Sequence, residues 1–291
     1  MLFGNNRHII SASRRTDIPA FYTEWFIDKV RKGYCKVVNP YNPSQIKKVS
    51  LHPGDVAAAV FWTRRSGPLQ PYLRELDGRG FNYYFLYTVT GYPGVYEKGL
   101  PDIDETIDDF LALAELIGPE KVIWRYDPVI ITPELNTDYH IRNFTRLAFR
   151  LSPGTKNVII TFVKRYRHIE EKLKDMGYAV PSPGDRSALE ERFLSAASAE
   201  GMRIKGCGKR DTLNNVHKGK CIDDMLMREL FGLELFTGKD RGQPEECNCI
   251  RSIDIGSYGS CLHRCVYCYA SRNFVRAERR YREHDYRAEM L

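Results

Sequence analysis

Three cysteines stand close together near the end of the chain, in the stretch SCLHRCVYCYA at 260–270. Cys261, Cys265 and Cys268 have the spacing C-x-x-x-C-x-x-C, which suits ligands of one metal centre. A tetrahedral zinc would need a fourth ligand, from His263 or another cysteine. A 4Fe–4S cluster held by three cysteines would keep one iron open, and an open coordination position is where chemistry takes place.

Four further cysteines predict a second metal centre in the same part of the chain, and they are Cys207, Cys221, Cys247 and Cys249. Four thiols suffice for an auxiliary 4Fe–4S cluster or a zinc, and the C-x-C pair at 247 and 249 favours ligation. The alternative is a group of buried, inert thiols. Cys35 stands alone and is expected to be structural.

The compartment matters for this interpretation of the cysteines. The 291 residues begin without a signal-peptide pattern and contain no apolar run of membrane-spanning length, so we expect a cytoplasmic protein with no membrane partner. In such a reducing compartment clustered thiols are more often metal ligands than disulfides. The formal net charge of +7 is compatible with an anionic cofactor or with nucleic acid, but it is too small to favour nucleic acid.

Apolar strand-like runs alternate with amphipathic helical segments along the chain. We expect strands at 8–13, 56–63, 83–90, 122–127, 157–163, 202–207 and 252–257. Helices are expected at 22–32, 104–117, 137–151, 166–176, 185–200, 221–231 and 272–284. This alternation predicts an α/β fold, a parallel β/α barrel or partial (TIM-like) barrel. No glycine-rich phosphate loop follows a strand, which argues against an open dinucleotide-binding sheet.

Charged residues follow several of the predicted strands, where functional groups of such folds lie. Arg14 and Asp17 follow the first strand and Arg64 the second. Arg125 and Asp127 interrupt an otherwise apolar strand, and a buried charge is costly unless it is paired or used. We therefore expect these side chains to line a site.

The cysteine loop resembles that of the radical S-adenosylmethionine (radical SAM) superfamily, in which an aromatic residue precedes the third cysteine, as Tyr267 does here. The wider C-x-H-x-C-x-Y-C-Y-A pattern is similar to the spore photoproduct lyase-like branch. The resemblance implies a cluster on Cys261, Cys265 and Cys268, with S-adenosylmethionine on its open iron and Tyr267 against the adenine. It also implies hydrogen abstraction by a 5′-deoxyadenosyl radical and an electron donor such as flavodoxin or ferredoxin.

Two features depart from that superfamily. Its cysteine loop follows the first strand, whereas here it follows the last, and the Gly-Gly-Glu stretch that grips the amino group of S-adenosylmethionine is missing. A circular permutation would explain the first departure, because strand 252–257 would then precede strand 8–13 in one sheet. Ser11, Ser13, Arg14 or Asp17 would replace the missing clamp. SRRTDIPAFY, FWTRR, WRYDP and CIDD, together with the region around the cysteine loop, also resemble an uncharacterised bacterial domain family with this permuted arrangement.

The sequence therefore predicts one integrated domain made of a barrel body at 1–208, a cysteine-bearing segment at 209–251 and a permuted cluster strand, loop and helix at 252–291. Arg14, Asp17, Arg125 and Asp127 are the candidate catalytic residues. Ser13, Arg64, Asp127 and Tyr267 are the candidate cofactor-binding residues. The substrate stays open. The alternative function is a zinc- or cluster-containing protein that binds or repairs nucleic acid.

Overall fold

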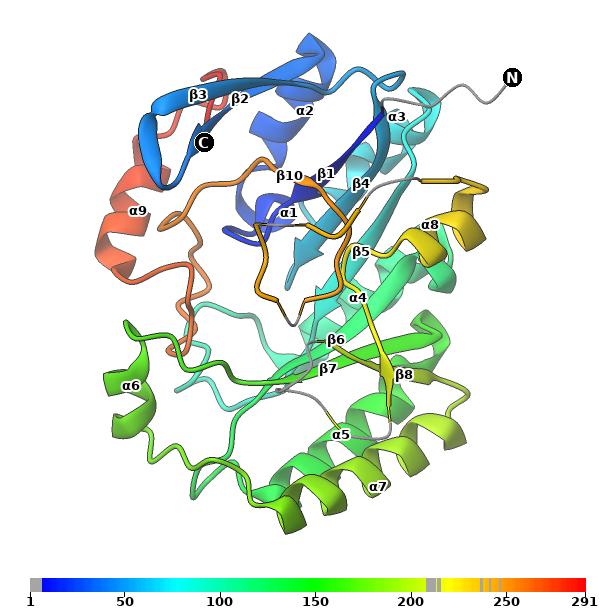
Figure 1. The fold of residues 1–291 in the computed structure, drawn as a ribbon, viewed down its shortest axis with the longest axis vertical. Helices are drawn as coiled ribbons and strands as arrows, with labels where there is room; N and C mark the ends of the chain where they lie inside the picture. The colour runs from blue at the N-terminus through cyan, green and yellow to red at the C-terminus, as the bar shows by residue number, and fades with distance from the viewer. Residues whose placement is uncertain (1–6, 208–212, 214–215, 236–237, 241, 246) are drawn as a thin grey trace.

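A parallel sheet forms the centre of the computed structural model, which describes residues 7–207, 213, 216–235, 238–240, 242–245 and 247–291 (Figure 1). Within these residues the sheet has eight strands in the order β10-β1-β4-β5-β6-β7-β8-β9, and every neighbouring pair is parallel. The strands are β1 (His8–Ala12), β4 (Val56–Thr63), β5 (Tyr83–Thr88), β6 (Val122–Val129), β7 (Asn157–Phe162), β8 (Arg203–Gly206), β9 (His217–Lys218) and β10 (Ile253–Asp254). The predicted α/β class with a large parallel sheet is confirmed.

The helices follow the predicted alternation with strands. They are α1 (Ile18–Phe21), α2 (Thr23–Lys32), α3 (Leu73–Gly78), α4 (Ile103–Ile117), α5 (Thr137–Leu151), α6 (Glu170–Asp175), α7 (Pro183–Ala199), α8 (Asp224–Phe231) and α9 (Phe274–Arg282). An antiparallel hairpin of β2 (Tyr34–Asn39) and β3 (Asn42–Ser50) was not predicted. Nearly all of β3 is exposed, so its sequence lacks the apolar alternation that identifies a half-buried strand.

The first and last strands of the sheet in sequence are neighbours. Ile10 pairs with Ile253 and Ser11 with Asp254, in parallel. The prediction that strands 8–13 and 252–257 lie side by side is therefore confirmed, although β10 has only two residues. When β10 is counted first, the order β10-β1-β4-β5-β6-β7-β8 advances in one direction across the sheet.

The two faces of the sheet pack against different parts of the chain. Side chains alternate between faces along a strand, so Phe85 and Tyr87 of β5 lie on one face and Tyr84 and Leu86 on the other. The first face is covered by helices, including α5 and α7, which lie side by side (Figure 1) and stack Phe144 on Phe193 with ring centroids 4.2 Å apart.

The second face is covered by the segment from Cys221 to Ile250, which includes α8. Ile222, Leu226 and Met227 are buried in the same cluster as Tyr84 and Leu86 of the sheet. This segment carries three of the four cysteines of the predicted second centre, and its packing brings them to the sheet. The predicted boundary between residues 208 and 209 lies outside the described residues.

No helix in the described part of the chain is both long and apolar enough to cross a membrane.

Candidate active site

A cavity of about 300 Å³ lies where the strands end on the face covered by the 221–250 segment. Strand alternation places Arg125 and Asp127 of β6 on this face, together with Trp62, Thr88 and Thr161 of neighbouring strands. All seven clustered cysteines also line it: Cys207, Cys221, Cys247, Cys249, Cys261, Cys265 and Cys268. We call it the thiol cavity. Both predicted metal centres therefore share one cavity with most of the predicted site residues.

Arg125 and Asp127 form a partly buried ion pair in the thiol cavity. Arg125 Nη2 and Thr161 Oγ1 both donate to the carboxylate of Asp127. The guanidinium of Arg125 also lies 4.8 Å from the ring centre of Trp62, which is a cation–π distance. The two charges that interrupt the apolar strand are thus paired with each other, and their position at the cavity agrees with the prediction.

Asp254 joins the two ends of the chain. Its carboxylate accepts hydrogen bonds from Ser11 Oγ at 3.1 Å, Ser13 Oγ at 2.6 Å and the backbone N–H of Arg14 at 2.9 Å. Gly256 N–H adds a fourth bond at 3.0 Å. The two serine hydroxyls were predicted to replace the missing clamp. In the structure they donate to Asp254 and so connect β1 to β10.

Asp17 is a second buried carboxylate with many partners. It caps α1 by accepting from Ala20 N–H at 3.0 Å, and it also accepts from Thr63 Oγ1 and the backbone N–H of Arg64, both at 2.8 Å. Its remaining partner is His263 Nε2 at 2.7 Å, in the cysteine loop. These contacts make Asp17 a positioning residue that ties the loop after β4 to the cysteine loop; its predicted catalytic role stays a prediction.

Arg64 belongs to a buried polar network next to the cysteine loop. Its guanidinium donates to Glu97 Oε1 at 2.7 Å and to Tyr267 OH at 2.8 Å, and Glu97 also accepts from Thr90 Oγ1 at 2.7 Å. Burial lowers the pKa of Arg64, but the charges of Glu97 and Tyr267 outweigh it and raise this pKa overall. The Tyr267 hydroxyl is thus occupied by Arg64 and Glu97, and only its ring is available for the predicted adenine contact.

The three-cysteine loop is attached to the loop after β5. Gly99 N–H donates to His263 O at 2.9 Å, and Val266 N–H donates to Tyr96 O at 3.0 Å. A side chain at Gly99 would place its Cβ 2.4 Å from the Leu262 carbonyl oxygen, so this close approach requires glycine. The cysteine loop is therefore fixed by backbone contacts to a neighbouring loop.

Burial raises the pKa of each thiol in this loop, and it raises that of Cys265 to about 12. The three side chains are thus neutral thiols at physiological pH without a metal. Because metals bind thiolates, a metal here would have to displace their protons.

The other four thiols contact one another in a ring. Sγ of Cys221 lies 3.8 Å from Sγ of Cys207, and Cys249 and Cys247 complete the ring. Contacts with Cys221 and Cys247 lower the pKa of both Cys207 and Cys249, because the neighbouring thiols donate to these sulfurs. The same contacts raise the pKa of Cys221 and Cys247. The structure thus brings together four cysteines that lie far apart in sequence.

Neither group of thiols forms a preorganised shell for a single ion. Across the described ranges, no three His, Cys, Asp or Glu side chains are arranged to enclose one metal ion. An iron–sulfur cluster contributes its own bridging sulfides, so its cysteines surround a larger body than one ion does. Three thiols on one loop, all lining one cavity, match the donor type and number of a three-cysteine cluster site.

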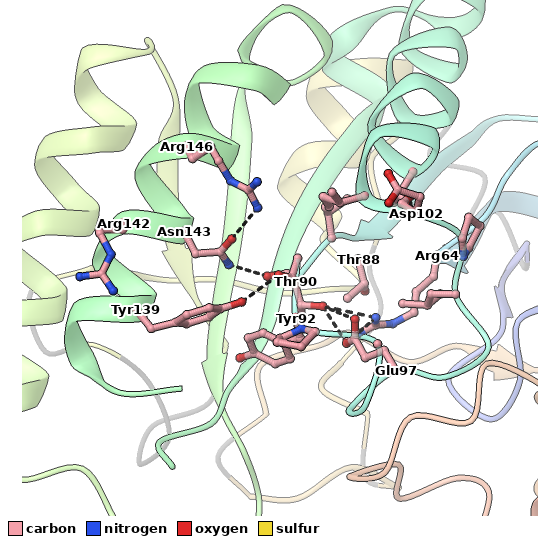
Figure 2. Close-up of a pocket in the computed structure, with 18 residues that line it drawn as sticks. Arg64, Thr88, Thr90, Tyr92, Glu97, Asp102, Tyr139, Arg142, Asn143 and Arg146 are labelled. Carbon is pink, nitrogen blue, oxygen red and sulfur yellow. Dashed lines mark hydrogen bonds and ion pairs between the residues drawn. The ribbon is translucent and has the colours of Figure 1, made fainter. Parts of the chain in front are cut away.

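A second pocket of about 750 Å³ lies beside the thiol cavity, between the end of β5 and the helices α4 and α5 (Figure 2). Arg64 and Thr88 line both spaces. Figure 2 shows Arg142 and Arg146 of α5 on one side of the pocket and the Arg64–Glu97 pair on the other. The Arg64 network is therefore the wall between the two spaces.

The sequence did not single out several residues of this region. Trp62 and Thr161 were hidden in apolar strands, and only the two-residue alternation marks them as facing the same way as Arg125. Glu97 and Asp254 had no signal, because the side chains that bind them, Arg64 for Glu97 and Ser11 and Ser13 for Asp254, lie far away in the sequence. Seven residues predicted as catalytic or cofactor-binding line the thiol cavity, and Ser11 does not; the seven are Ser13, Arg14, Asp17, Arg64, Arg125, Asp127 and Tyr267.

Two solved structures to which the chain is similar are distant likenesses. The carboxyl transferase domain of Rhizobium etli pyruvate carboxylase is 12% identical with a TM-score of 0.28, and the match covers 69% of this chain and 35% of that one. A putative alpha-L-fucosidase from Bacteroides thetaiotaomicron is 11% identical with a TM-score of 0.28, and the match covers 97% of both chains. Likenesses this weak carry no argument about fold or activity.

No curated protein matches the chain. A family model does match, over residues 9–270, which include β1 except for His8, the residues that line the thiol cavity and the cysteine loop. The match spans both ends of the β1–β10 junction, in agreement with the expected resemblance to an uncharacterised domain family. The chain belongs to the family described as Domain of unknown function (DUF1848).

Proposed function

We propose that this protein is a radical SAM-type iron–sulfur enzyme built on a circularly permuted partial barrel. The observation that carries the proposal is the parallel pairing of β10 with β1. It puts the cysteine loop directly after a strand that precedes β1 in the sheet, which is the order the superfamily resemblance requires. The thiols of Cys261, Cys265 and Cys268, which line one cavity, support the same assignment.

Cys261, Cys265 and Cys268 would hold the cluster, and S-adenosylmethionine would bind in the thiol cavity beside Tyr267. When bound, the two cofactors would supply a 5′-deoxyadenosyl radical that abstracts hydrogen from a substrate. The protein's own part is to hold and enclose the reactants. Asp17 fixes the cysteine loop through His263, and the Arg64–Glu97–Tyr267 network closes the cavity on the side of the second pocket.

The ring of Cys207, Cys221, Cys247 and Cys249 would hold a second centre, an auxiliary 4Fe–4S cluster or a zinc. Its four thiols are the number that either centre takes from a protein. The 3.8 Å between the sulfurs of Cys207 and Cys221 is about the edge of a tetrahedron with zinc–sulfur bonds of about 2.3 Å, although the described thiols do not by themselves enclose a single ion. Zinc and iron analysis of the same sample distinguishes the two.

The experiment that tests the proposal is anaerobic purification or reconstitution, followed by iron and sulfide analysis. We expect about four irons per chain if the second site holds zinc and about eight if it holds iron. Cys268→Ala should remove the iron of the first centre together with 5′-deoxyadenosine formation. Cys35→Ala is the matched control, because Cys35 is a buried thiol that packs in the apolar core and does not line the cavity. Iron content that stays the same in Cys268→Ala would contradict the assignment.

A further inference from the structure

Two arginines of the thiol cavity are stacked on the same aromatic ring. The guanidinium of Arg14 lies 5.3 Å from the ring centre of Trp62, and that of Arg125 lies 4.8 Å from it. The side chains of Arg14 and Arg125 are 14% and 16% exposed. Trp62 itself is held by a hydrogen bond from its Nε1 to Ser11 Oγ at 3.1 Å. Two positive charges are thus fixed at one place on the cavity wall.

These two guanidiniums carry hydrogen-bond donors that are not used. Arg14 Nη2 and Arg125 Nε are both buried and have no hydrogen-bond partner among the described residues. The same holds for Thr16 Oγ1 and His263 Nδ1, whose side chains are nine-tenths or more buried and line the same cavity. A buried polar atom without a partner costs about 1–3 kcal/mol, and more when it is charged. Four such atoms around one cavity indicate a polar occupant.

The charges of the two arginines are only partly balanced. Asp127 pairs with Arg125, but the nearest carboxylate oxygen recorded for the Arg14 guanidinium, on Asp240, lies 4.0 Å away. The carboxylate of Asp254 contacts the backbone of Arg14. A planar guanidinium with free N–H groups is the donor that best matches the oxygens of a carboxylate or a phosphate.

The location of these arginines distinguishes them from Arg64. Arg14 and Arg125 line the thiol cavity together with the four cysteines of the ring. The Arg14 guanidinium lies 4.0 Å from Asp240, whose backbone N–H donates to Cys249 O at 3.0 Å. Arg64, in contrast, is paired with Glu97 and donates to Tyr267 OH. The unused donors of Arg14 and Arg125 therefore lie on the part of the cavity wall that adjoins the four-cysteine ring.

We propose that the thiol cavity binds the oxyanion group of a small acidic molecule, a carboxylate or a phosphate, between Arg14 and Arg125 and beside the four-cysteine ring. The role of this molecule as the substrate rests on the proposed function above. The anion would use Arg14 Nη2 and Arg125 Nε, and the acidic molecule would lie between the two cysteine groups, so that the rest of it extends toward the three-cysteine loop.

The test is isothermal titration calorimetry on the anaerobically reconstituted protein without reductant. The probes are succinate, inorganic phosphate and succinamide, which is a neutral isostere of succinate. We expect one of the two anions to bind and succinamide not to bind, and the anion that binds identifies carboxylate or phosphate as the group recognised. Arg14→Gln and Arg125→Gln should each weaken this binding at least tenfold, because each removes a charged donor.

Arg142→Gln is the matched control, since it removes the same charge from the exposed side of the second pocket. It should change the affinity less than twofold. If Arg125→Gln does not fold, Arg14→Gln decides the result, because the Arg14 side chain has the weaker ion pair. Metal content is measured on every variant.

Three results would overturn the proposal. One is that neither anion binds to the wild-type protein, or that both arginine variants bind it unchanged. Another is that the variants lose metal together with binding, because the arginines would then serve to neutralise the thiolates. The last is that S-adenosylmethionine displaces the anion, which would show that Arg14 and Arg125 bind the carboxylate of this cofactor and not a separate acidic molecule. Anion binding with no 5′-deoxyadenosine formation would instead contradict the proposed function and leave the anion site standing.

Discussion

At the scale of single residues, two buried carboxylates hold the candidate site together. Asp254 accepts from the end of β1, and Asp17 accepts from the loop after β4 and from the cysteine loop. Each of them accepts hydrogen bonds from several N–H or O–H donors and so ties separate segments of the chain together. Residues of this kind fix the geometry of the cavity while other side chains contact the occupant.

We predict that Asp17→Asn destabilises the protein by about 2 to 4 kcal/mol, because an amide NH₂ would face donors that now share a carboxylate. Iron occupancy of the three-cysteine loop should fall with it, since His263 loses its partner. Chemical denaturation and iron analysis measure both effects. Asp102→Asn is the control, because Asp102 is an exposed cap of α4 and asparagine caps helices about as well. Equal stability of the two variants would contradict the role assigned to Asp17.

At the scale of elements, α5 is joined to β6 through a fully buried histidine. His140 donates from Nε2 to Ile130 O at 2.9 Å and accepts at Nδ1 from Tyr126 OH at 2.8 Å. Burial lowers the pKa of His140 from 6.5 to about 4, so the ring is neutral in the folded protein. This contact supports the strand that carries Arg125 and Asp127.

The lowered pKa predicts a loss of stability in acid. The unfolded chain takes up a proton at His140 below about pH 6.5, whereas the folded protein resists it until about pH 4. The stabilisation is therefore complete above pH 6.5 and is lost as the pH falls toward 4, by about 2 kcal/mol between pH 7 and 5. Urea unfolding of the wild type and of His140→Gln at both pH values measures this. The variant should show a smaller loss over this range; the same loss in both proteins would contradict the prediction.

How much the sequence could predict also differs between elements. Alternating apolar strands and capped helices identified the sheet strands from β1 to β8, because burial on both faces imposes long apolar runs. The hairpin of β2 and β3 escaped because β3 is almost wholly exposed. From the sequence, the four cysteines of the ring could be grouped only because their number suits one metal centre. The contacts between Cys207, Cys221, Cys247 and Cys249 depend on how the 221–250 segment crosses the sheet, which the sequence does not reveal.

At the scale of the whole molecule, the site depends on a joint between the two ends of the chain. The cysteine loop reaches the other strand ends only because β10 adds to β1, more than 240 residues away in sequence. The spacing of the three cysteines was visible in the sequence, but the pairing of these strands is a non-local property. The joint is tight, because a Cβ at Gly256 would lie 2.1 Å from Ser13 Oγ.

Gly256→Ala should therefore loosen the β1–β10 junction and lower both the melting temperature and the iron content of the three-cysteine loop. Gly78→Ala is the matched control, because nothing lies within 4 Å of a Cβ there and alanine favours a helix over glycine. We expect the control to be neutral or slightly stabilised. Full iron content and an unchanged melting temperature in Gly256→Ala would show that the joint does not position the loop.

The most direct test of the central claim is the formation of 5′-deoxyadenosine from S-adenosylmethionine by the anaerobically reconstituted wild-type protein after reduction with dithionite. The proposed function predicts brown, iron-containing protein that forms 5′-deoxyadenosine and methionine, with no product from the Cys268→Ala variant. Colourless protein that keeps stoichiometric zinc after reconstitution and forms no 5′-deoxyadenosine would contradict it.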